Sequence, residues 1–290
     1  MSLLVAAWQP LHALAHRAAS YAGMPRDPRV VFAVEFGVVH SATFWLLVAF
    51  FGFLRVTGCA DRYVTQGPQK RPSAALVFES AANAVLNHGL LQWAAAVWVI
   101  APLLERCGVL ANLTADAGAS SYPLDSWWEH GWRLAACIAV EDTAFYWTHR
   151  LLHQKRLYAA IHKRHHSFVA MHPLAGEHAH IVETLLSNLM PYYLGPILFG
   201  LHGSTFALWT YMRIAEAVDG HSGYALPFAP LYSPLSALLS RPHHDFHHSH
   251  GGGPDGVGTT GVYGSLTPFW DWACGTDKPY YDHVAKLKAA

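Results

Sequence analysis

Histidines gather in three short stretches of this chain, at spacings that suit metal binding. One stretch has an HxxxH pattern and two have an HxxHH pattern, and together they contain His149, His153, His162, His165, His166, His244, His247 and His248. Residues three or four apart on a helix share a face, so each stretch presents its imidazoles in one direction. Eight imidazoles exceed the coordination number of one ion. The spacing therefore predicts a centre with two metal ions.

The kind of metal follows from the kind of ligand. Neutral imidazole binds iron, zinc, copper and nickel. A structural zinc site would need four ligands and would favour cysteine, but the cysteines of this chain form no CxxC pair. A hydrolytic zinc site would need three ligands and an open position. A dinuclear site held mainly by imidazole instead indicates redox-active iron that binds O2, beside a lipid substrate.

The backbone must change direction between the first two histidine stretches. His153 and His162 are nine residues apart, which is about two and a half turns of an α-helix. One continuous helix would send the two stretches to opposite sides. If both serve one centre, the helix breaks or reverses between Gln154 and Ile161.

One acid lies on the helical face of the first histidine stretch. Asp142 and Tyr146 precede His149 and His153 at spacings of three and four residues, so all four share a face. A carboxylate in this position can accept the second ring N–H of a ligand histidine and orient its ring. We therefore expect Asp142 to orient a metal ligand.

Other polar residues are assigned no role in the site. Glu177 and Glu183 stand just before an apolar run, where acids favour the first turn of a helix. A histidine outside the three stretches is usually an ordinary core or surface residue. This interpretation covers His12, His16, His88, His130, His202 and His283. The sequence leaves open whether His172, His178 and His180 have a role, and they are not included in the predicted ligand set.

Two apolar runs are long enough to cross a membrane. The chain is 52% hydrophobic and only 13% charged, which is little charge for a soluble protein. Val30–Leu54 and Ser80–Leu104 can each span about 30 Å of hydrocarbon as a helix. The alternative is a soluble helical bundle with a large core. We favour membrane helices because soluble helices are usually shorter than these runs.

Two further apolar runs are less regular. Thr184–Met212 is uncharged but contains several prolines and glycines, which predicts a bent span or a hairpin of two helices. Leu134–Trp147 is too short for a clean span and carries Glu141 and Asp142. Acids are costly in lipid, so these two should face the protein interior.

The distribution of charge argues against one class of partner and predicts an orientation. Nineteen Lys and Arg balance nineteen Asp and Glu, and no base-stacking motif is present, so nucleic acid is not an expected partner. Lys155, Arg156, Lys163 and Arg164 stand among the histidines, which places them on the cytosolic side by the positive-inside tendency. Residues 1–20 lack a basic n-region and are predicted to be an interfacial segment.

The motifs together resemble those of the fatty acid hydroxylase and sterol desaturase superfamily of membrane non-haem di-iron enzymes. The similarity runs from about Trp127 to Tyr281 and rests on YWTHRLLH (146–153), YAAIHKRHH (158–166), DGHSGYALP (219–227), RPHHDFHH (241–248) and FWDWACGTD (269–277). Within the superfamily the motif sequences are most similar to those of the C-4 methylsterol monooxygenases, in which a DxHSGY stretch and a HHDFHH stretch occur together.

This resemblance implies a ligand set and a source of electrons. It makes the eight histidines named above iron ligands and adds His221 of the HSGY stretch. It also implies two iron ions, O2 as co-substrate, and electrons from NAD(P)H through a reductase and cytochrome b5. Because no haem-binding segment is visible in the chain, a separate donor is expected. The implied location is the endoplasmic reticulum membrane.

The chain departs from the family pattern after the third histidine stretch. The family runs quickly into an NYG-like turn, whereas this chain inserts the glycine-rich segment Gly251–Gly261 before Val262, Tyr263 and Gly264. We expect this insertion at the cytosolic rim. The terminal KLKAA resembles a dilysine retrieval signal of the endoplasmic reticulum.

The resulting prediction is an all-α, polytopic membrane helical bundle with a cytosol-facing, histidine-rich di-iron region. Residues 1–125 would hold the interfacial segment and membrane helices, and residues 126–290 the catalytic domain. The predicted activity is oxidation of a sterol C-4 methyl group with O2, through hydroxymethyl and aldehyde to carboxylate. Tyr146, Trp147, Phe168 and Trp270 are candidates to line the lipid pocket.

Several alternatives stay open on the sequence alone. Within the superfamily they are a sterol C-5 desaturase, a cholesterol side-chain hydroxylase, a fatty acyl hydroxylase and an aldehyde-forming wax enzyme, which use the same ligands and differ in pocket shape. Outside the enzyme class, a histidine-rich membrane metal carrier is the rival. A carrier would hold exchangeable metal, whereas the enzyme would hold iron tightly and consume O2.

Overall fold

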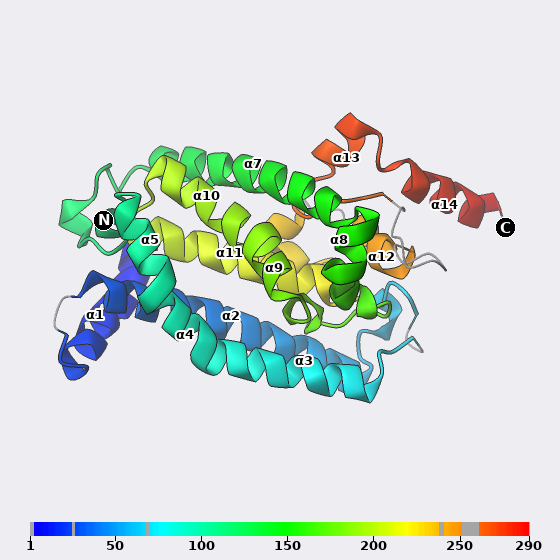
Figure 1. Ribbon diagram of the computed structural model, residues 1–290, viewed down its shortest axis with the longest axis horizontal. Coiled ribbons are helices and arrows are strands. Elements are labelled where there is room, and N and C mark those ends of the chain that lie inside the picture. The colour runs from blue at the N-terminus through cyan, green and yellow to red at the C-terminus, as the bar shows by residue number, and fades with distance from the viewer. Residues whose placement is uncertain (1–2, 25–26, 68–69, 238–240, 251–260, 290) are drawn as a thin grey trace. The chain divides into compact units, whose positions relative to one another are not determined.

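Helices joined by short turns make up the chain. The structure, a computed structural model, describes residues 3–24, 27–67, 70–237, 241–250 and 261–289. Within these ranges there is no β-strand, and one isolated bridge pairs Val64 with Tyr224. The α-helices in chain order (Figure 1) are α1 Leu3–Tyr21, α2 Pro28–Thr57, α3 Ala74–Leu86, α4 Gln92–Ala95, α5 Ala101–Arg106, α6 Leu110–Leu113, α7 Trp127–Leu152, α8 Lys155–Ala160, α9 Ile181–Glu183, α10 Met190–Phe199, α11 Gly203–His221, α12 Arg241–His250, α13 Phe269–Cys274 and α14 Lys278–Ala289. The predicted all-α class is confirmed.

The chain divides into two compact units, each built from three separate segments. The first unit comprises Met1–Phe44, Ala84–Val140 and Tyr193–Ile214, and the second comprises Trp45–Asn83, Glu141–Tyr192 and Ala215–Ala290. Several long helices therefore contribute residues to both units. All nine histidines that the motifs single out as iron ligands belong to the second unit.

Two helices in the described part of the chain are long and apolar enough to cross a membrane. They are α2 and a continuous helix over Ala74–Arg106, and they contain the two predicted runs. Only 28% and 22% of their apolar windows are buried inside the protein. The core helix of a soluble protein would be mostly buried, so this uncovered apolar surface favours a lipid environment.

The two candidate spans contact each other at a glycine. Ala74–Arg106 joins α3, α4 and α5 through π-helical segments at Asn87–Leu91 and Ala96–Ile100. Trp93 lies against Gly37 of α2, and its indole Nε1–H donates to the carbonyl of His88 at 2.7 Å. Gln92 Nε2 donates to Ser41 Oγ of α2 at 2.6 Å. A small residue at the crossing lets two helices approach closely, and a polar contact joins them.

The irregular run Thr184–Met212 contains a break between two helices. This agrees with the second of the two predicted arrangements, in which the run forms two helices rather than one bent span. α10 ends at Phe199 and α11 begins at Gly203, and between them Gly200 has a φ of +57°. Within the first unit, the rings of Tyr193 and Phe206 stack with their centroids 6.1 Å apart. Pro196 lies inside α10. The break therefore falls at a glycine, which takes up the left-handed backbone without steric cost.

The acids of the short apolar run are buried, as predicted. Leu134–Trp147 lies within α7, where Glu141 is 2% and Asp142 is 4% exposed. Of the glycine-rich insertion, residues 251–260 lie outside the described residues. The lysines of the KLKAA tail stand in the last turn of α14.

We expect Gly37→Ala to destabilise the protein. A Cβ at position 37 would lie 2.7 Å from Trp93 Cη2, and the bond of the indole to His88 hinders the ring from moving. Overpacking of this kind costs about 1–3 kcal/mol, so the Tm in detergent should fall. Gly52→Ala, on the same helix with no atom within 4 Å of the new Cβ, should leave the Tm unchanged or slightly raised. Equal Tm values for the two variants would contradict the close contact at Gly37.

Candidate metal centre

Four separate elements of the second unit bring nine histidines together. The contributing elements are the end of α7, the 3-10 helix His162–Ser167, the end of α11 and helix α12. The histidines are His149 and His153, then His162, His165 and His166, then His221, and finally His244, His247 and His248. These are the nine residues that the sequence motifs singled out, and the structure places them in two adjoining groups.

The helix break that the spacing required is present. α7 ends at Leu152, and Gln154 has an extended ψ of 135°. The short helix α8 follows, and Ile161 then leaves helical geometry with a φ of −126° and a ψ of −64°. The second histidine stretch consequently turns back toward the first. This prediction is confirmed.

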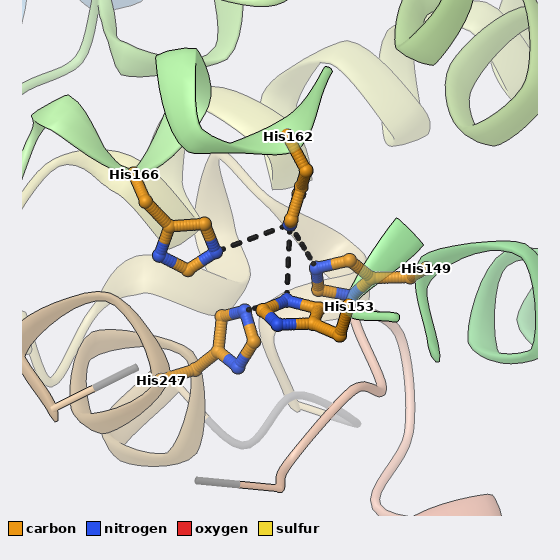
Figure 2. Close-up of side chains that lie close together, drawn as sticks. All are labelled: His149, His153, His162, His166 and His247. Carbon is orange, nitrogen blue, oxygen red and sulfur yellow. Dashed lines mark hydrogen bonds between the residues drawn. The ribbon is translucent and has the colours of Figure 1, made fainter. Parts of the chain in front are cut away.

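The larger group, which we call group A, converges on the ring of His162. Its members are His149, His153, His162, His166 and His247. The Nε2 atom of His162 lies 3.0 Å from that of His149, 3.0 Å from that of His153 and 3.1 Å from that of His166. His153 Nε2 also lies 3.1 Å from His247 Nε2. Figure 2 shows these five rings with their nitrogen atoms directed at one another.

In the smaller group, which we call group B, ring nitrogens also face one another. Its members are His165, His221, His244 and His248. His221 Nε2 lies 3.0 Å from His244 Nε2 and 3.4 Å from His165 Nε2. Both ring nitrogens of His248 are buried and make no hydrogen bond with the described residues. A buried polar atom is costly without a partner, and the nitrogen of the neutral His248 ring that carries no proton has a lone pair that a metal ion can accept.

The two groups interleave along the chain. The consecutive residues His165 and His166 belong to groups B and A, and His248 and His247 divide in the same way. The rings of His166 and His248 stack with centroids 4.8 Å apart, so the groups adjoin. The sequence interpretation, in which each stretch faces one direction, is correct for histidines four residues apart, since His162 and His166 share group A and His244 and His248 share group B. It is wrong for adjacent histidines, because neighbouring residues point about 100° apart around a helix and so enter different groups.

Burial keeps these imidazoles neutral. Eight of the nine are buried, and His221 is partly buried. Burial, and next the neighbouring imidazoles, lower the pKa of His162, His165 and His166 well below the ordinary histidine value. Burial lowers the pKa of His247 to about 4. Neutral rings keep a free lone pair, which is the form that binds a metal ion.

Backbone carbonyls determine which ring nitrogen carries the proton. Nδ1–H of His149 donates to the carbonyl of Tyr263 at 2.8 Å, and Nδ1–H of His247 donates to that of Gly261 at 3.1 Å. Nδ1–H of His221 donates to the carbonyl of Ala217 at 2.7 Å. In each case Nε2 is left unprotonated and directed into its group. Lone pairs facing each other at about 3 Å repel unless a cation lies between them.

The residues present therefore fit two transition-metal ions. One group offers five imidazoles and the other four. Nitrogen atoms about 3 Å apart match neighbouring ligands of one ion at the usual metal–nitrogen distance of about 2.0–2.1 Å. Imidazole suits iron, zinc, copper and nickel, whereas magnesium and calcium require oxygen ligands.

A short segment after the glycine-rich insertion positions two of the rings. This segment, residues 261–267, is called the strap below. Asp271 accepts hydrogen bonds from the backbone N–H groups of Tyr263 and Gly264, both at 2.8 Å. Val262 has a φ of +62°, a conformation that is costly for a β-branched residue. The surrounding bonds hold the strap in this conformation, and its carbonyls are thereby fixed against His149 and His247.

Asp142 contacts the strap. One of its carboxylate oxygens accepts from Thr267 N–H at 2.8 Å and the other from Thr267 Oγ1–H at 2.6 Å. The sequence suggested a direct bond from Asp142 to a ligand ring, but the acceptor for His149 is the carbonyl of Tyr263. Asp142 thus reaches the histidines through the strap. An influence of Asp142 on metal binding stays a prediction.

One acid that the sequence analysis set aside lies beside group A. Glu183 is 4% exposed, and its Oε1 lies 2.9 Å from His162 Nδ1 without the alignment of a hydrogen bond. The sequence interpretation of Glu183 as a helix-start residue is correct, since α9 begins at Ile181. Its nearness to His162 is a tertiary contact that no local spacing reveals. His178, by contrast, contacts Ser80 Oγ at 3.1 Å and belongs to neither group.

Comparison with known proteins agrees with this geometry. A family model described as fatty acid hydroxylase matches residues 134–276, which include all nine histidines. Methylsterol monooxygenase 2-1 of Arabidopsis thaliana is 32% identical over 87% of this chain and 89% of its own length. Methylsterol monooxygenase 1 of Rattus norvegicus is 39% identical over 54% of this chain, which covers half (50%) of the rat protein.

One relative with a similar level of sequence identity is named for a different reaction. Very-long-chain aldehyde decarbonylase GL1-11 of Oryza sativa subsp. indica is 36% identical over 56% of this chain and 58% of its own length. No solved structure matches the chain significantly. The resemblance inferred from the histidine motifs is confirmed by the family match and by an alignment that covers most of a methylsterol monooxygenase. The chain belongs to the fatty acid hydroxylase family.

Proposed function

We propose that this protein is a membrane di-iron monooxygenase that oxidises a C-4 methyl group of a sterol with O2. The observation that carries the proposal is the convergence of nine imidazoles, eight buried and one partly buried, in groups of five and four. It is supported by the similarity to methylsterol monooxygenase 2-1, which extends over 89% of that protein. Two iron ions bound at this centre would supply the oxidising power needed to break an unactivated C–H bond.

The chain's own residues hold, orient and shield this centre. Group A and group B would each hold one iron. The strap carbonyls keep the Nδ1 protons of His149 and His247, so that Nε2 stays available to the metal. The nearly complete burial of the rings limits water around the reacting groups, which strengthens electrostatic interactions there.

Four aromatic residues are candidates to line a lipid pocket: Tyr146, Trp147, Phe168 and Trp270. Tyr146 and Phe168 are fully buried, and Tyr146 stacks on Trp270 with centroids 6.0 Å apart. Trp270 Nε1–H also donates to Thr143 Oγ1 at 3.0 Å. Trp147, in contrast, is 48% exposed. These contacts support packing for Tyr146 and Trp270, and they leave Trp147 and Phe168 as the candidates for contact with the sterol.

Electrons are proposed to come from NAD(P)H through a reductase and cytochrome b5. Lys163 and Arg164 are exposed on the 3-10 helix that carries His162, His165 and His166, and Lys155 and Arg156 are exposed on α8 just before it. Such a basic surface would attract an electron carrier with an acidic surface and favour productive encounters. The basic residues and the metal ligands alternate within His162–Ser167, so the docked carrier would lie close to the metals.

The membrane arrangement follows from the same residues. α2 and Ala74–Arg106 would cross the bilayer, α10 and α11 would form a hairpin, and the basic histidine region would face the cytosol. We propose the endoplasmic reticulum as the location, with KLKAA as a retrieval signal. We also propose residues 1–125 as the membrane-anchoring part and residues 126–290 as the catalytic domain, which contains the whole family match.

A second candidate activity is conversion of very-long-chain aldehydes. It is favoured by the 36% identity with the rice aldehyde decarbonylase over 56% of this chain. The histidine centre would serve both reactions, so the substrate must decide between them. The alignment with the rice protein covers less of this chain than the alignment with methylsterol monooxygenase 2-1, and we therefore rank sterol oxidation first.

We expect iron-replete membranes containing the protein to convert 4,4-dimethylsterol to C-4 hydroxymethyl and carboxylate sterols with NADPH and O2. The products are measured by mass spectrometry, and His165→Ala is the matched inactive control because it removes one ligand of group B. A very-long-chain aldehyde is supplied in parallel. Unchanged sterol together with consumption of the aldehyde would replace the first candidate by the second.

His162→Ala should lower the iron content of the purified protein by at least one ion per chain and abolish turnover. The reason is that His162 Nε2 lies within 3.1 Å of three other group A rings. Iron is measured by mass spectrometry and folding by circular dichroism. His283→Ala, which changes a histidine of α14 outside both groups, should keep both ions. Full iron in the His162→Ala protein would remove this residue from the ligand set.

Asp142→Asn should weaken iron retention, because an amide nitrogen would replace one of the two oxygens that accept from Thr267. Loss of a partner that orients ligands typically costs about 10–100-fold in metal affinity or activity. Thr267→Val removes the hydroxyl of the same contact and should act in the same direction. If Asp142 works only through the strap, the double variant loses no more than Asp142→Asn alone.

The control is Asp282→Asn on the exposed surface of α14, which should behave as the unchanged protein. Iron retention against a chelator and turnover are both measured. Fully additive losses in the double variant would show that Asp142 acts by another route.

A further inference from the structure

A second cluster of possible ligands lies in the first unit, in a part of the chain that the proposed oxygenase centre does not use. It consists of His12 and His16 on α1 and Asp116 in the turn before the 3-10 helix Ala117–Ala119. One donor atom from each residue lies within 4.8 Å of the other two. His12 and His16 are spaced four residues apart, so both rings project from one face of α1.

The ring nitrogens and the carboxylate oxygen of this cluster are spaced like the ligands of one metal ion. His12 Nε2 lies 3.2 Å from His16 Nε2 and 3.2 Å from Asp116 Oδ1. A single proton on His12 Nε2 can point at only one of these neighbours. Two ligands of a tetrahedral ion with bonds of about 2.0–2.1 Å are separated by roughly 3.3 Å, which is close to the observed spacing. An ion among the three atoms would satisfy all of them at once.

A buried carboxyl group orients the central ring. Glu35 of α2 is 6% exposed and bonds to His12 Nδ1. This leaves Nε2 of His12 as the atom directed at His16 and Asp116. A carboxylate that holds the second nitrogen of a ligand histidine is the usual support of a zinc site, because it fixes the ring and makes it a stronger donor.

The surrounding structure holds each partner of the cluster in place. Trp8 stacks on His12 with centroids 4.2 Å apart, and α1 buries Val5, Trp8, Ala15 and Ala19 along the same face as His12. Next to Asp116, the carbonyl of Ala115 accepts from His202 Nε2–H at 3.0 Å. Asp116 occupies the N-cap position of its 3-10 turn but does not cap it with its side chain. Its carboxylate is thus directed at His12 instead.

We propose that His12, His16 and Asp116 bind one zinc ion, with water at the fourth position, and that this ion fastens α1 to the turn at Asp116. Two imidazoles and one carboxylate with an open position are a typical zinc ligand set. The site differs from groups A and B in having a carboxylate ligand and an exposed edge, since the Asp116 side chain is 85% exposed. It is independent of the proposed oxygenase activity.

The test measures zinc in the full-length, iron-loaded protein in detergent after incubation with zinc chloride and desalting. The variants are His16→Ala and Asp116→Asn, which change partly buried and exposed residues and should fold normally, whereas His12→Ala would open a buried position. Asp125→Asn, an exposed acid nine residues further along, is the matched control. His165→Ala reports on the oxygenase centre separately.

The expected result is one zinc per chain in the unchanged protein, in Asp125→Asn and in His165→Ala, and none in His16→Ala or Asp116→Asn. Glu35→Gln should weaken zinc binding by about 10–100-fold. Zinc should also slow amide exchange in α1, and only where the site is intact. Equal zinc in all variants would overturn the proposal, and so would loss of zinc in His165→Ala alone, which would assign the ion to groups A and B. None of these outcomes depends on sterol turnover.

Discussion

Burying nine imidazoles against one another is unfavourable unless cations accept their lone pairs, and the second unit is organised around that constraint. The rings of group A contact one another through Nε2 atoms at about 3 Å, and the carbonyls of Tyr263 and Gly261 keep the protons on the opposite nitrogens of His149 and His247. Without a metal ion, a proton on His162 Nε2 could be shared with only one of the three rings that face it, and the other contacts would lack a bridging proton from His162 in a region with little water. The helix break at Gln154, the 3-10 helix after α8 and the strap all serve to produce this arrangement.

The strap shows how acids can support a metal centre without contacting it. Asp271 and Asp142 are both buried, and both accept hydrogen bonds from residues 263–267. Asp271 accepts from two backbone N–H groups, and Asp142 accepts from the backbone N–H and the hydroxyl of Thr267. These hydrogen bonds offset the backbone strain at Val262. A residue with a φ of +62° keeps this conformation only where its neighbours enforce it. The carboxylates therefore stabilise a backbone shape, and the backbone in turn orients the rings.

Much of this site was accessible from the sequence, because metal ligands are encoded by residue type and local spacing. Eight of the histidines, the break between Gln154 and Ile161, the two apolar spans and the burial of Glu141 and Asp142 follow from local patterns, whereas His221 was implied only by the family resemblance. The division of neighbouring histidines between groups A and B does not, since it depends on how the segments that carry them, His162–Ser167 and α12, pack against each other in the second unit. The contact of Glu183 with His162 and the link from Asp142 to Thr267 join residues far apart in the chain. His12 and His16 had a readable HxxxH spacing, but their carboxylate partners lie 23 and 104 residues away from His12.

Because α12 and the strap come late in the chain, the ribosome synthesises them after the first two histidine stretches. His244, His247 and His248, and the carbonyls that orient His149 and His247, all come from the last fifty residues. During synthesis from the N-terminus, both apolar spans can enter the bilayer while group A still lacks His247 and group B lacks two of its four rings. Insertion into the membrane can therefore precede metal loading, and an unfinished chain would present several unpaired imidazoles to the cell. These exposed imidazoles distinguish such a chain from the folded protein, and they offer a basis for its recognition by quality-control factors.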